Sequence, residues 1–303
     1  MDGDSVVVLT FRRADREPLP AWAPGAHIDV ILKPGLTRQY SLCGDPDDHD
    51  VWQIAVLRES APRGRGGSEH LHQSLAVGSV TQVRGPRNHF ALHEADSYLF
   101  IAGGIGITPL KPMIQSVAAA GANWLLAYGG RSRSTMAFHS ELEQYGDRVR
   151  CFPQDETGLL DLDQLLGSFP DGGLVYCCGP GPLLDAVEQK CAGLPPGSLH
   201  MERFTPREPG GATQQQGFGI ELVQSGLSLD VPPDKSILEV LEENGVSLLS
   251  SCRAGICGTC ETAVLEGVPE HRDSVLTPEE RQANEYMMVC VSRCSGSRLV
   301  LDL

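Results

Sequence analysis

The sequence SSCRAGICGTCE at Ser250–Glu261 holds three closely spaced cysteines. A fourth follows after a gap of 29 residues, so that the set consists of Cys252, Cys257, Cys260 and Cys290. Three thiolates from one tight loop and a fourth from a separate strand are the ligand pattern of a plant-type 2Fe-2S cluster. The spacing therefore predicts a site for two iron atoms bridged by sulfides.

The small residues between these cysteines support the same interpretation. Backbone N–H groups must turn inward to hydrogen-bond the sulfur atoms, and these bonds influence the reduction potential. Gly255 and Gly258 allow such a loop, because glycine reaches backbone conformations that other residues avoid.

Two alternatives concern the metal and the fourth ligand. Structural zinc usually takes two C-x2-C pairs, or one such pair with two histidines, and here only one pair has that spacing. Cys294 competes with Cys290 for the fourth position. We favour Cys290 because it follows the apolar run Met287–Val289, which can hold it against a core.

Length and composition place limits on the rest of the chain. The 303 residues suit two or three domains, and a hydrophobic content of 41% is enough for buried cores. A net charge of −15 argues against nucleic acid and anionic membranes as partners. Ten cysteines in so long a chain, four of them with a metal role, indicate a reducing compartment, and we expect a cytoplasmic protein.

Residues 1–94 have the pattern of a small antiparallel β-barrel. Short β-rich runs alternate with clusters of Pro, Gly and Asp. The predicted strands are Val6–Phe11, His27–Leu32, Gln39–Leu42, Trp52–Leu57 and Ser79–Arg84, with one helical stretch at Ser68–Leu75.

Two pieces of this segment suggest a site for a phosphorylated aromatic ligand. Arg38 and Tyr40 share one face of a strand, where an arginine can bind phosphate and a tyrosine can cover a ring. The sequence Arg65–Ser68, RGGS, opens the predicted helix, and its free N–H groups with the Ser68 hydroxyl form an anion site.

Residues 95–206 alternate strand and helix, as in an α/β domain with a parallel sheet. The apolar run Tyr98–Ala102 leads into the glycine-rich turn GGIGITP, and Pro109 is expected to begin a helix that ends at Ala120. A strand, a glycine-rich turn and a helix N-terminus together predict a dinucleotide pyrophosphate site.

The remaining elements of this segment support a parallel sheet. We expect strands at Asn123–Tyr128, Val149–Phe152 and Leu174–Cys178, and helices at Thr135–Tyr145, Asp161–Leu166 and Pro182–Cys191. Ligands of such sheets bind beyond the carboxyl ends of the strands, where Gly104, Arg131 and Cys178 lie. A buried core thiol is the alternative for Cys178.

Residues 207–216 are almost free of apolar side chains and are expected to form a linker. Residues 217–303 contain the cysteine loop. The predicted elements there are a hairpin at Gly219–Val223 and Leu227–Val231, helices at Ser236–Asn244 and Thr277–Ala283, and strands at Thr262–Leu265 and Arg298–Leu303.

These motifs, in this order, resemble the phthalate dioxygenase reductase family over nearly the whole chain. RQYSL at Arg38–Leu42 is similar to the family's flavin motif, GGIGITP and YCCGP to its nucleotide motifs, and CRAGICGTC with Cys290 to its ferredoxin. RGPRNHF and HRDSVLT are especially similar to the reductase parts of self-sufficient haem-thiolate monooxygenases. The resemblance implies a multi-domain fold with a flavin barrel, an α/β nucleotide domain and an α+β, β-grasp ferredoxin domain.

The resemblance also implies a function and a set of cofactors. Electrons would move from NAD(P)H through FMN to the 2Fe-2S cluster, and then to an oxygenase component or a fused haem or Rieske domain. FMN is implied rather than FAD, because GRGGS supplies a site for a terminal phosphate and no aromatic platform for an adenine is found.

The family's site residues transfer to matching positions of this sequence. The residues implied at the reacting atoms are Ser41, Cys178 and Glu202. Those implied to bind flavin or nucleotide are Arg38, Gln39, Tyr40, Ser41, Gly66, Gly67, Ser68, Gly103, Gly104, Gly106, Thr108, Arg131, Arg133, Cys178, Gly179, Pro180 and Phe204. The metal ligands are Cys252, Cys257, Cys260 and Cys290.

Some alternatives stay open at this point. Arg131 and Arg133 follow the second strand of the nucleotide domain and favour NADPH over NADH. The family's barrel normally has a strand before Val6–Phe11, so the start is either truncated or part of a longer fusion. Two other classes are an electron carrier with a vestigial nucleotide site and a zinc-stabilised scaffold.

Overall fold

A computed structural model describes residues 5–33, 36–59, 66–170, 172–207 and 216–303. The chain divides into two compact units, Met1–Arg203 and Phe204–Leu303. Residues 208–215, most of the predicted linker, and residues 60–65, which include Arg65, lie outside the described ranges. No helix within those ranges has the length and hydrophobicity needed to cross a membrane.

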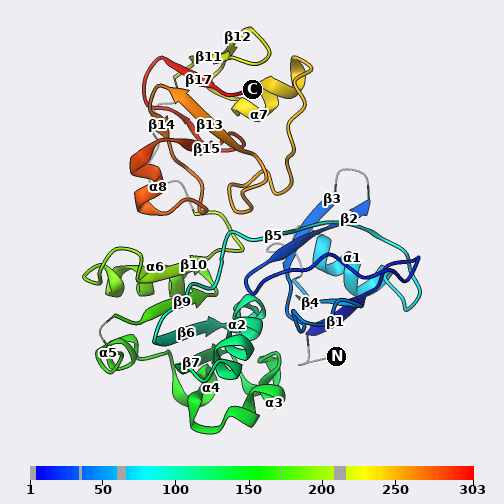
Figure 1. Cartoon of the computed structure of the whole chain (residues 1–303), viewed down its shortest axis with the longest axis vertical. Coiled ribbons are helices and arrows are strands. Elements are labelled where there is room, and N and C mark those ends of the chain that lie inside the picture. Colours follow the sequence, from blue (N-terminus) through cyan, green and yellow to red (C-terminus); the bar gives the residue numbers. More distant parts are fainter. Residues whose placement is uncertain (1–4, 34–35, 60–65, 171, 208–215) are drawn as a thin grey trace. The chain divides into compact units, whose positions relative to one another are not determined.

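The first part of the first unit is an antiparallel β-barrel (Figure 1). Its elements are β1 (Val6–Phe11), β2 (His27–Lys33), β3 (Leu36–Ser41), β4 (Trp52–Leu57), α1 (Gly67–Ser74) and β5 (Gln82–Arg87). One sheet has the order β3-β2-β5 and the other pairs β1 with β4. A bridge between Leu42 and Ile54 joins the two sheets, and both residues are fully buried in the barrel core.

The second part of this unit is a five-stranded parallel sheet. Its strands are β6 (Ser97–Gly103), β7 (Asn123–Gly130), β8 (Val149–Pro153), β9 (Leu174–Cys178) and β10 (Leu199–Glu202), in the order β10-β9-β6-β7-β8. The strand order reverses between β6 and β9, and the carboxyl ends of strands at such a point are where ligands bind.

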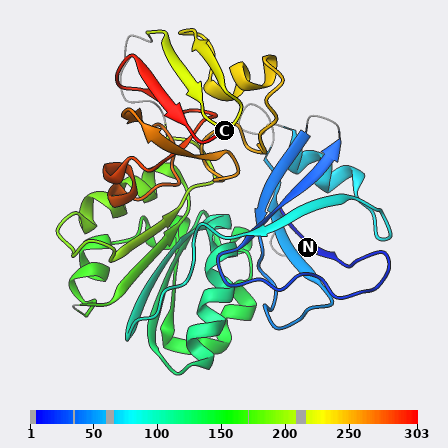
Figure 2. The same ribbon diagram turned by 45° about the horizontal axis from the view of Figure 1, so that its top comes forward.

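Helices cover both faces of this sheet (Figure 2). They are η1 (Gly104–Gly106), α2 (Ile107–Ala119), η2 (Arg133–Thr135), α3 (His139–Leu142), η3 (Glu143–Arg148), α4 (Gln154–Thr157), α5 (Leu162–Gly167) and α6 (Gly181–Cys191). Alternate residues of β6 are buried on opposite faces: Leu99 and Ile101 pack with α5 and α6, while Phe100 packs on the other face against the tilted ring of Tyr176, with ring centres 5.8 Å apart. Burial on both faces explains the continuous apolar sequence of the strand.

Two sequence predictions for this part of the chain need correction, and one strand was missed. The helix expected at Thr135–Tyr145 is divided among η2, α3 and η3, because Phe138 has a φ of 60°, which is not compatible with a right-handed helix. Helix α2 begins at Ile107, so Pro109 is its third residue; the first four N–H groups of a helix lack partners, and proline is tolerated there too. The strand β10 was not predicted, and it pairs with β9 through Glu202 and Cys178.

The second unit is a mixed sheet with the order β12-β11-β17-β13-β15, covered by a helix. Its elements are β11 (Phe218–Leu222), β12 (Leu227–Val231), α7 (Ile237–Glu243), β13 (Glu261–Glu266), β14 (Pro269–Glu270), α8 (Pro278–Ala283), β15 (Tyr286–Met288), β16 (Arg293–Cys294) and β17 (Arg298–Leu301). Helix α7 follows Ser236, where the predicted helix begins: Ser236 Oγ accepts the N–H of Glu239 and the Glu239 carboxylate accepts the N–H of Ser236. Its buried residues and those of β11 and β17 form one core.

Candidate functional sites

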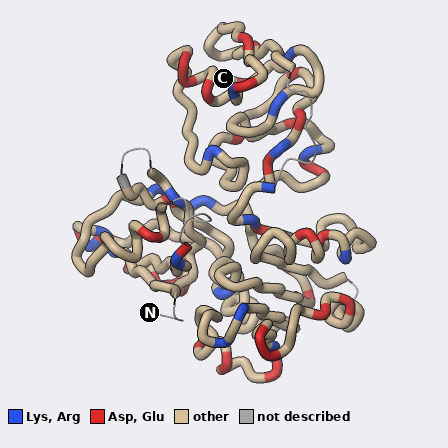
Figure 3. The backbone as a smooth tube through the Cα atoms, turned by 180° about the vertical axis from the view of Figure 1, so that it is seen from behind, with Lys and Arg blue, Asp and Glu red and all other residues tan. Residues whose placement is uncertain are grey.

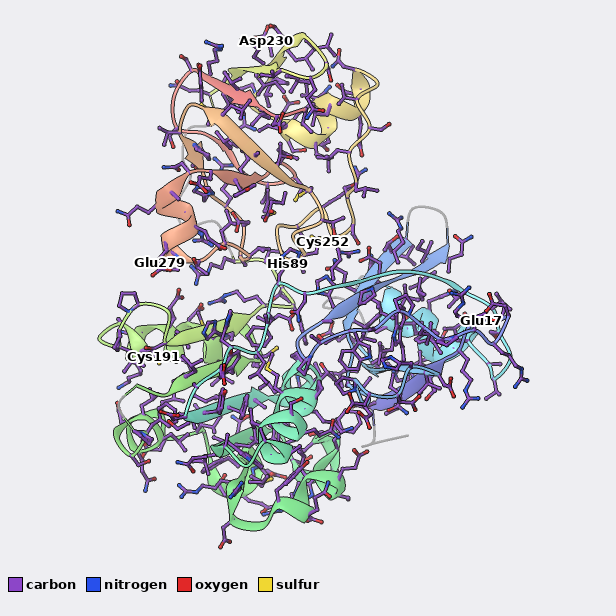
Figure 4. All side chains as sticks on the ribbon, viewed as in Figure 1. Glu17, His89, Cys191, Asp230, Cys252 and Glu279 are labelled. Atoms are coloured by element: carbon purple, nitrogen blue, oxygen red, sulfur yellow. The ribbon has the colours of Figure 1, made fainter. Side chains whose placement is uncertain are left out.

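The loop between α7 and β13 carries three of the four predicted metal ligands (Cys252 is labelled in Figure 4). Gly255 and Gly258 have φ values of 67° and 69°, as their place in the motif predicted. The N–H groups of Ala254 and Ile256 turn inward and donate to Cys252 Sγ at 3.3 and 3.4 Å. The backbone therefore supplies the hydrogen bonds that a cluster ligand needs.

Cys290 follows β15 and lies with the other three thiols. The Val289 N–H donates to the Cys260 carbonyl at 3.4 Å, and the Val289 carbonyl accepts the N–H of Leu238 at 3.1 Å, so the segment is held between the cysteine loop and α7. Hydrogen bonds from the Cys257 and Cys290 thiols lower the pKa of Cys252 well below its usual range, and sharing protons with Cys252 and Cys260 raises the pKa of Cys290. Such mutual effects require the sulfur atoms to lie close together.

Cys294 is directed elsewhere. It lies on β16, where its Sγ accepts the N–H of Gly296 at 3.2 Å and lies 3.4 Å from the Arg298 carbonyl. Among the described residues, no three His, Cys, Asp or Glu side chains form a group suited to one metal ion. A 2Fe-2S cluster instead divides four thiolates between two iron atoms, which fits the donor set gathered here.

Asp273 braces the cysteine loop and was not singled out from the sequence. Its side chain is fully buried and accepts the N–H groups of Val275 and Leu276 at 3.0 and 2.9 Å. The next residue donates its N–H to the Gly255 carbonyl at 2.7 Å, and the Asp273 Cα lies 3.0 Å from where a β-carbon on Gly255 would be. An Asp followed by Ser and an apolar run is a turn signal that could have identified this brace.

On the barrel, β3 brings Arg38 against the start of α1. A β-carbon on Gly67 would come within 2.5 Å of Arg38 Cγ, so glycine is required for this contact. Gly66 has a φ of 75° and precedes the helix. The Ser68 hydroxyl bonds the backbone N–H and carbonyl of Glu59, at 3.1 and 3.3 Å.

The neighbouring residues of β3 are enclosed to different degrees. Tyr40 is half-buried, and burial raises the pKa of its phenol, which therefore stays neutral. The side-chain amide of Gln39 is a buried donor without a hydrogen-bond partner in the described part of the chain. A buried donor of this kind is expected to meet an acceptor that is not part of the protein.

At the switch point of the parallel sheet, the two predicted nucleotide loops are packed against each other. A β-carbon on Gly106 would lie 2.2 Å from the Cys178 carbonyl oxygen, and one on Gly103 would lie 2.6 Å from Pro180 Cδ. Gly179 is also tightly packed, with Gly103 Cα 3.0 Å from the position of its missing β-carbon. These glycines are needed because backbone approaches backbone.

Side chains behind the glycine-rich turn hold its shape. The Tyr128 hydroxyl lies 3.2 Å from the Gly104 carbonyl, and Thr108 Oγ1 donates to the Ile105 carbonyl at 2.9 Å. Gly104 has a φ of 54° with open space where a β-carbon would be. The turn therefore presents free backbone at the N-terminus of the 13-residue helix α2, the kind of position where phosphates bind.

The structure brings the three predicted reacting-site residues together at this edge. Ser41 Oγ donates to Glu202 Oε2 at 3.4 Å, and Glu202 pairs with Cys178 in the register of β10 and β9. The Glu202 residue is partly exposed, but protein encloses its carboxyl, and this burial raises the pKa of Glu202 to about 8. Burial, with a smaller contribution from Glu202, also raises the pKa of the Cys178 thiol.

The two predicted arginines differ in their surroundings. Arg133 Nε forms an ion pair with Glu156 at 3.0 Å, and its Nη1 lies 3.4 Å from His139 Nε2. Arg131 is exposed and forms no ion pair within the described residues. Phe204 is half-buried and begins the second unit, so its predicted place near a flavin stays a prediction.

Both predicted nucleotide loops and all four predicted ligand cysteines fall within matches to known protein families. Residues 100–189 match the family described as an oxidoreductase NAD-binding domain, and residues 220–295 match that described as a 2Fe-2S iron-sulfur cluster binding domain. The chain therefore combines nicotinamide binding with a 2Fe-2S centre.

Whole-chain relatives have the same organisation. The chain is 44% identical over 302 residues to the phenoxybenzoate dioxygenase subunit beta of Ectopseudomonas oleovorans. The match covers 99% of this chain and 93% of that protein. The solved structure of phthalate dioxygenase reductase is 35% identical with a TM-score of 0.71, covering 100% of this chain and 95% of that one. An intact type IV self-sufficient cytochrome P450 monooxygenase is 43% identical with a TM-score of 0.93 over 100% of this chain, which spans only 40% of that protein.

The conformation of Gly255 leads to a first prediction. In Gly255→Ala, the new β-carbon would lie 2.6 Å from Val291 Cγ2 at a positive φ, so we expect the cysteine loop to open and the protein to lose most of its iron and acid-labile sulfide. Gly296→Ala in the same unit, whose β-carbon would meet only Cys294 Sγ at 3.9 Å, is the control and retains both. Equal iron and sulfide per chain in the two variants would contradict the prediction.

The buried Glu202 carboxyl leads to a second prediction. Its folded pKa of about 8 lies above the ordinary glutamate pKa of 4.5, so its contribution to stability is complete below about pH 4.5 and is lost as the pH rises through about 8. The glutamine side chain of the Glu202→Gln variant does not titrate. The melting temperature of the variant minus that of the native protein should therefore be larger at pH 9 than at pH 6. Thermal melts of the full-length protein at the two pH values check this, and Glu94→Gln, which replaces an exposed carboxyl, is the control. A difference between Glu202→Gln and native protein that is the same at both pH values would refute it.

Proposed function

This chain belongs to the phthalate dioxygenase reductase family, and from that premise we propose that it passes electrons from NAD(P)H through FMN and a 2Fe-2S cluster to an oxygenase. The observation that carries the proposal is the meeting of Ser41 from the barrel with Glu202 and Cys178 at the switch point of the parallel sheet. The NAD(P)H-dependent reductase activity follows from the family.

Two kinds of carrier are required because a nicotinamide donates a hydride, a two-electron donor, whereas a 2Fe-2S cluster accepts one electron at a time, and a flavin converts between the two. The protein contributes binding, orientation and electrostatics. No residue of the chain needs to act as a general acid or base.

We assign the flavin to the face of the barrel formed by β3 and the start of α1. Arg38, packed on Gly67, binds the phosphate together with the free N–H groups at the N-terminus of α1, which has eight residues. Tyr40 lies along the flavin as a neutral ring. FMN fits this site, and chromatography of the flavin released by denaturation tests it, with FAD as the contrary result.

We assign the nicotinamide dinucleotide to the paired loops of the parallel sheet. Gly104, in the turn before α2, leaves the backbone open to the pyrophosphate, and Gly106 lets this turn pack on Cys178. Cys178, with Gly179 and Pro180, borders the nicotinamide side of the loop. Ser41 and Glu202 orient the reacting rings, and the enclosed carboxyl keeps its proton near neutral pH.

The ferredoxin unit is proposed to donate to an oxygenase, on a separate chain or in the same polypeptide. From Gly217 onward the sequence carries 14 Asp and Glu against 6 Lys and Arg, a net charge of −8. Figure 3 shows these acidic residues spread over several segments of the unit. A basic surface on the partner would complement this charge.

A substitution of the fourth ligand tests the electron path. Cys290→Ser is expected to lose the cluster and with it cytochrome c reduction, while the flavin of this variant is still reduced by NAD(P)H in anaerobic stopped-flow absorbance. Cys294→Ser, whose sulfur is directed to Gly296 and Arg298, is the matched control and retains every step. If neither NADH nor NADPH reduces the flavin of the native protein, the proposed function is wrong.

The arginines at the end of β7 test the nucleotide preference. We propose NADPH, with Arg131 binding the 2′-phosphate, because Arg133 is already paired with Glu156. Arg131→Ala should raise the Kd for NADPH by about 10- to 100-fold, as expected for losing a charged hydrogen bond, and leave the Kd for NADH nearly unchanged. Arg133→Ala should change the NADPH value much less. Equal effects of Arg131→Ala on the two nucleotides would argue against this assignment.

A further inference from the structure

Helix α2 places a lysine inside the protein, behind the glycine-rich turn. Lys111 is only 6% exposed, and an ammonium group removed from water is costly unless charges or dipoles surround it. Its position four residues after Ile107 puts it on the second turn of the helix whose N-terminus faces the nucleotide loop. Neither the glycine-rich motif nor the flavin motif includes it.

Three groups compensate the buried charge, and they come from different parts of the chain. Lys111 Nζ lies 2.9 Å from Glu141 Oε2 on α3 and 4.7 Å from the centre of the Phe138 ring. It also donates to the Cys43 carbonyl of the barrel at 3.2 Å. A single ammonium therefore connects the barrel to two elements of the parallel-sheet part.

On the barrel side, the accepting carbonyl is firmly placed. Cys43 is fully buried, and its N–H donates to the Gln53 carbonyl at 2.9 Å. The preceding Leu42 N–H donates to the Ala26 carbonyl at 2.8 Å. Because Ser41 lies only two residues before Cys43, a displacement of this carbonyl would move Ser41 as well.

On the nucleotide side, the contacts lead back to the glycine-rich turn. Phe138 has a φ of 60°, an unusual conformation for an aromatic residue that neighbouring contacts must hold in place. The Tyr128 hydroxyl lies 3.0 Å from the Ala137 carbonyl and 3.2 Å from the Gly104 carbonyl. The ring under Lys111 is therefore connected to the turn that we assign to the pyrophosphate.

We propose that Lys111 is a positioning residue that sets the separation between the hydride donor and the flavin, by holding the barrel segment after Ser41 against the glycine-rich turn. This inference rests on the proposed function for its kinetic consequence. Its structural part, that Lys111 fixes the Cys43 segment relative to α2, stands on the contacts alone. Lys111 touches neither cofactor in this proposal and acts through Cys43 and Phe138.

Lys111→Met tests the proposal, because methionine keeps the length and apolar stem of the side chain but removes its charge and donors. At saturating nucleotide, the limiting rate of flavin reduction should fall by about 10- to 100-fold, since small misplacements of reacting groups have effects of that size. The nucleotide Kd should stay within about twofold. The deuterium isotope effect with 4-deuterated nucleotide should rise, which a smaller fraction of folded protein would not produce.

Three further variants control for charge and for folding. Lys190→Met removes an exposed lysine that pairs with Asp163 in the same parallel-sheet part, and it should match the native protein in rate and isotope effect. Lys111→Arg keeps the charge and donors and should recover most of the rate. If Lys111→Met does not fold, Glu141→Gln, which removes only the exposed partner carboxylate, should show the same changes in smaller degree.

A measurement that needs no activity tests the structural part. In the full-length protein as purified, with no nucleotide added, amide hydrogen exchange of residues 42–45 and 103–108 should be faster in Lys111→Met than in Lys190→Met. Provided that NAD(P)H reduces the native protein, a Lys111→Met variant with the native rate of flavin reduction and the native isotope effect would overturn the inference. Amide exchange that is the same in Lys111→Met and Lys190→Met would overturn it as well. If NAD(P)H does not reduce the native protein, the proposed function is wrong. The exchange experiment would still test whether Lys111 fixes the Cys43 segment relative to α2.

Discussion

The Cys178 carbonyl oxygen lies so near Gly106 that a single added β-carbon would come within 2.2 Å of it. This backbone contact joins the carboxyl ends of β6 and β9, the two strands at which the order of the parallel sheet reverses. Because β10 pairs with β9 in register, the same contact sets where Glu202 lies, and Glu202 in turn meets Ser41 of the barrel. The site proposed to bring a nicotinamide and a flavin together is thus built outward from one close approach of two loops.

The cysteine loop of the second unit is likewise a glycine-containing loop that contacts from elsewhere in the chain hold in place. Its backbone takes conformations with positive φ at Arg253, Gly255 and Gly258, and these direct N–H groups toward Cys252. Such conformations persist only where surrounding contacts hold them, and the buried Asp273 with Ser274 supplies those contacts. In both units, a glycine permits the conformation and a buried polar group from elsewhere in the chain maintains it. Binding loops on a rigid sheet are a common arrangement, because the sheet fixes the loop ends.

Local pattern predicted much of this fold. The alternation of strand and helix after Ala95 and the helix starts at Ser236 and Thr277 were confirmed, because both depend on residues close in sequence. The helix expected at Thr135–Tyr145 was wrong, since its composition is helical but Phe138 adopts a left-handed conformation under Lys111. β10 was missed because LHME has the polar content of a loop and becomes a strand only by pairing with β9. Lys111 and Asp273 have no sequence signal as strong as a cysteine spacing, because their importance comes from burial.

The sequence by itself determined which groups were available: four cysteines with cluster spacing, a glycine-rich turn after an apolar strand, and an arginine and tyrosine on one strand face. These depend on intervals of a few residues, and short intervals constrain the backbone directly. The tertiary structure alone decided that Ser41 meets Glu202 across 161 residues and that Lys111 reaches Cys43 across 68. Contacts over such separations depend on strand register and on the packing of whole sheets, which no local pattern contains.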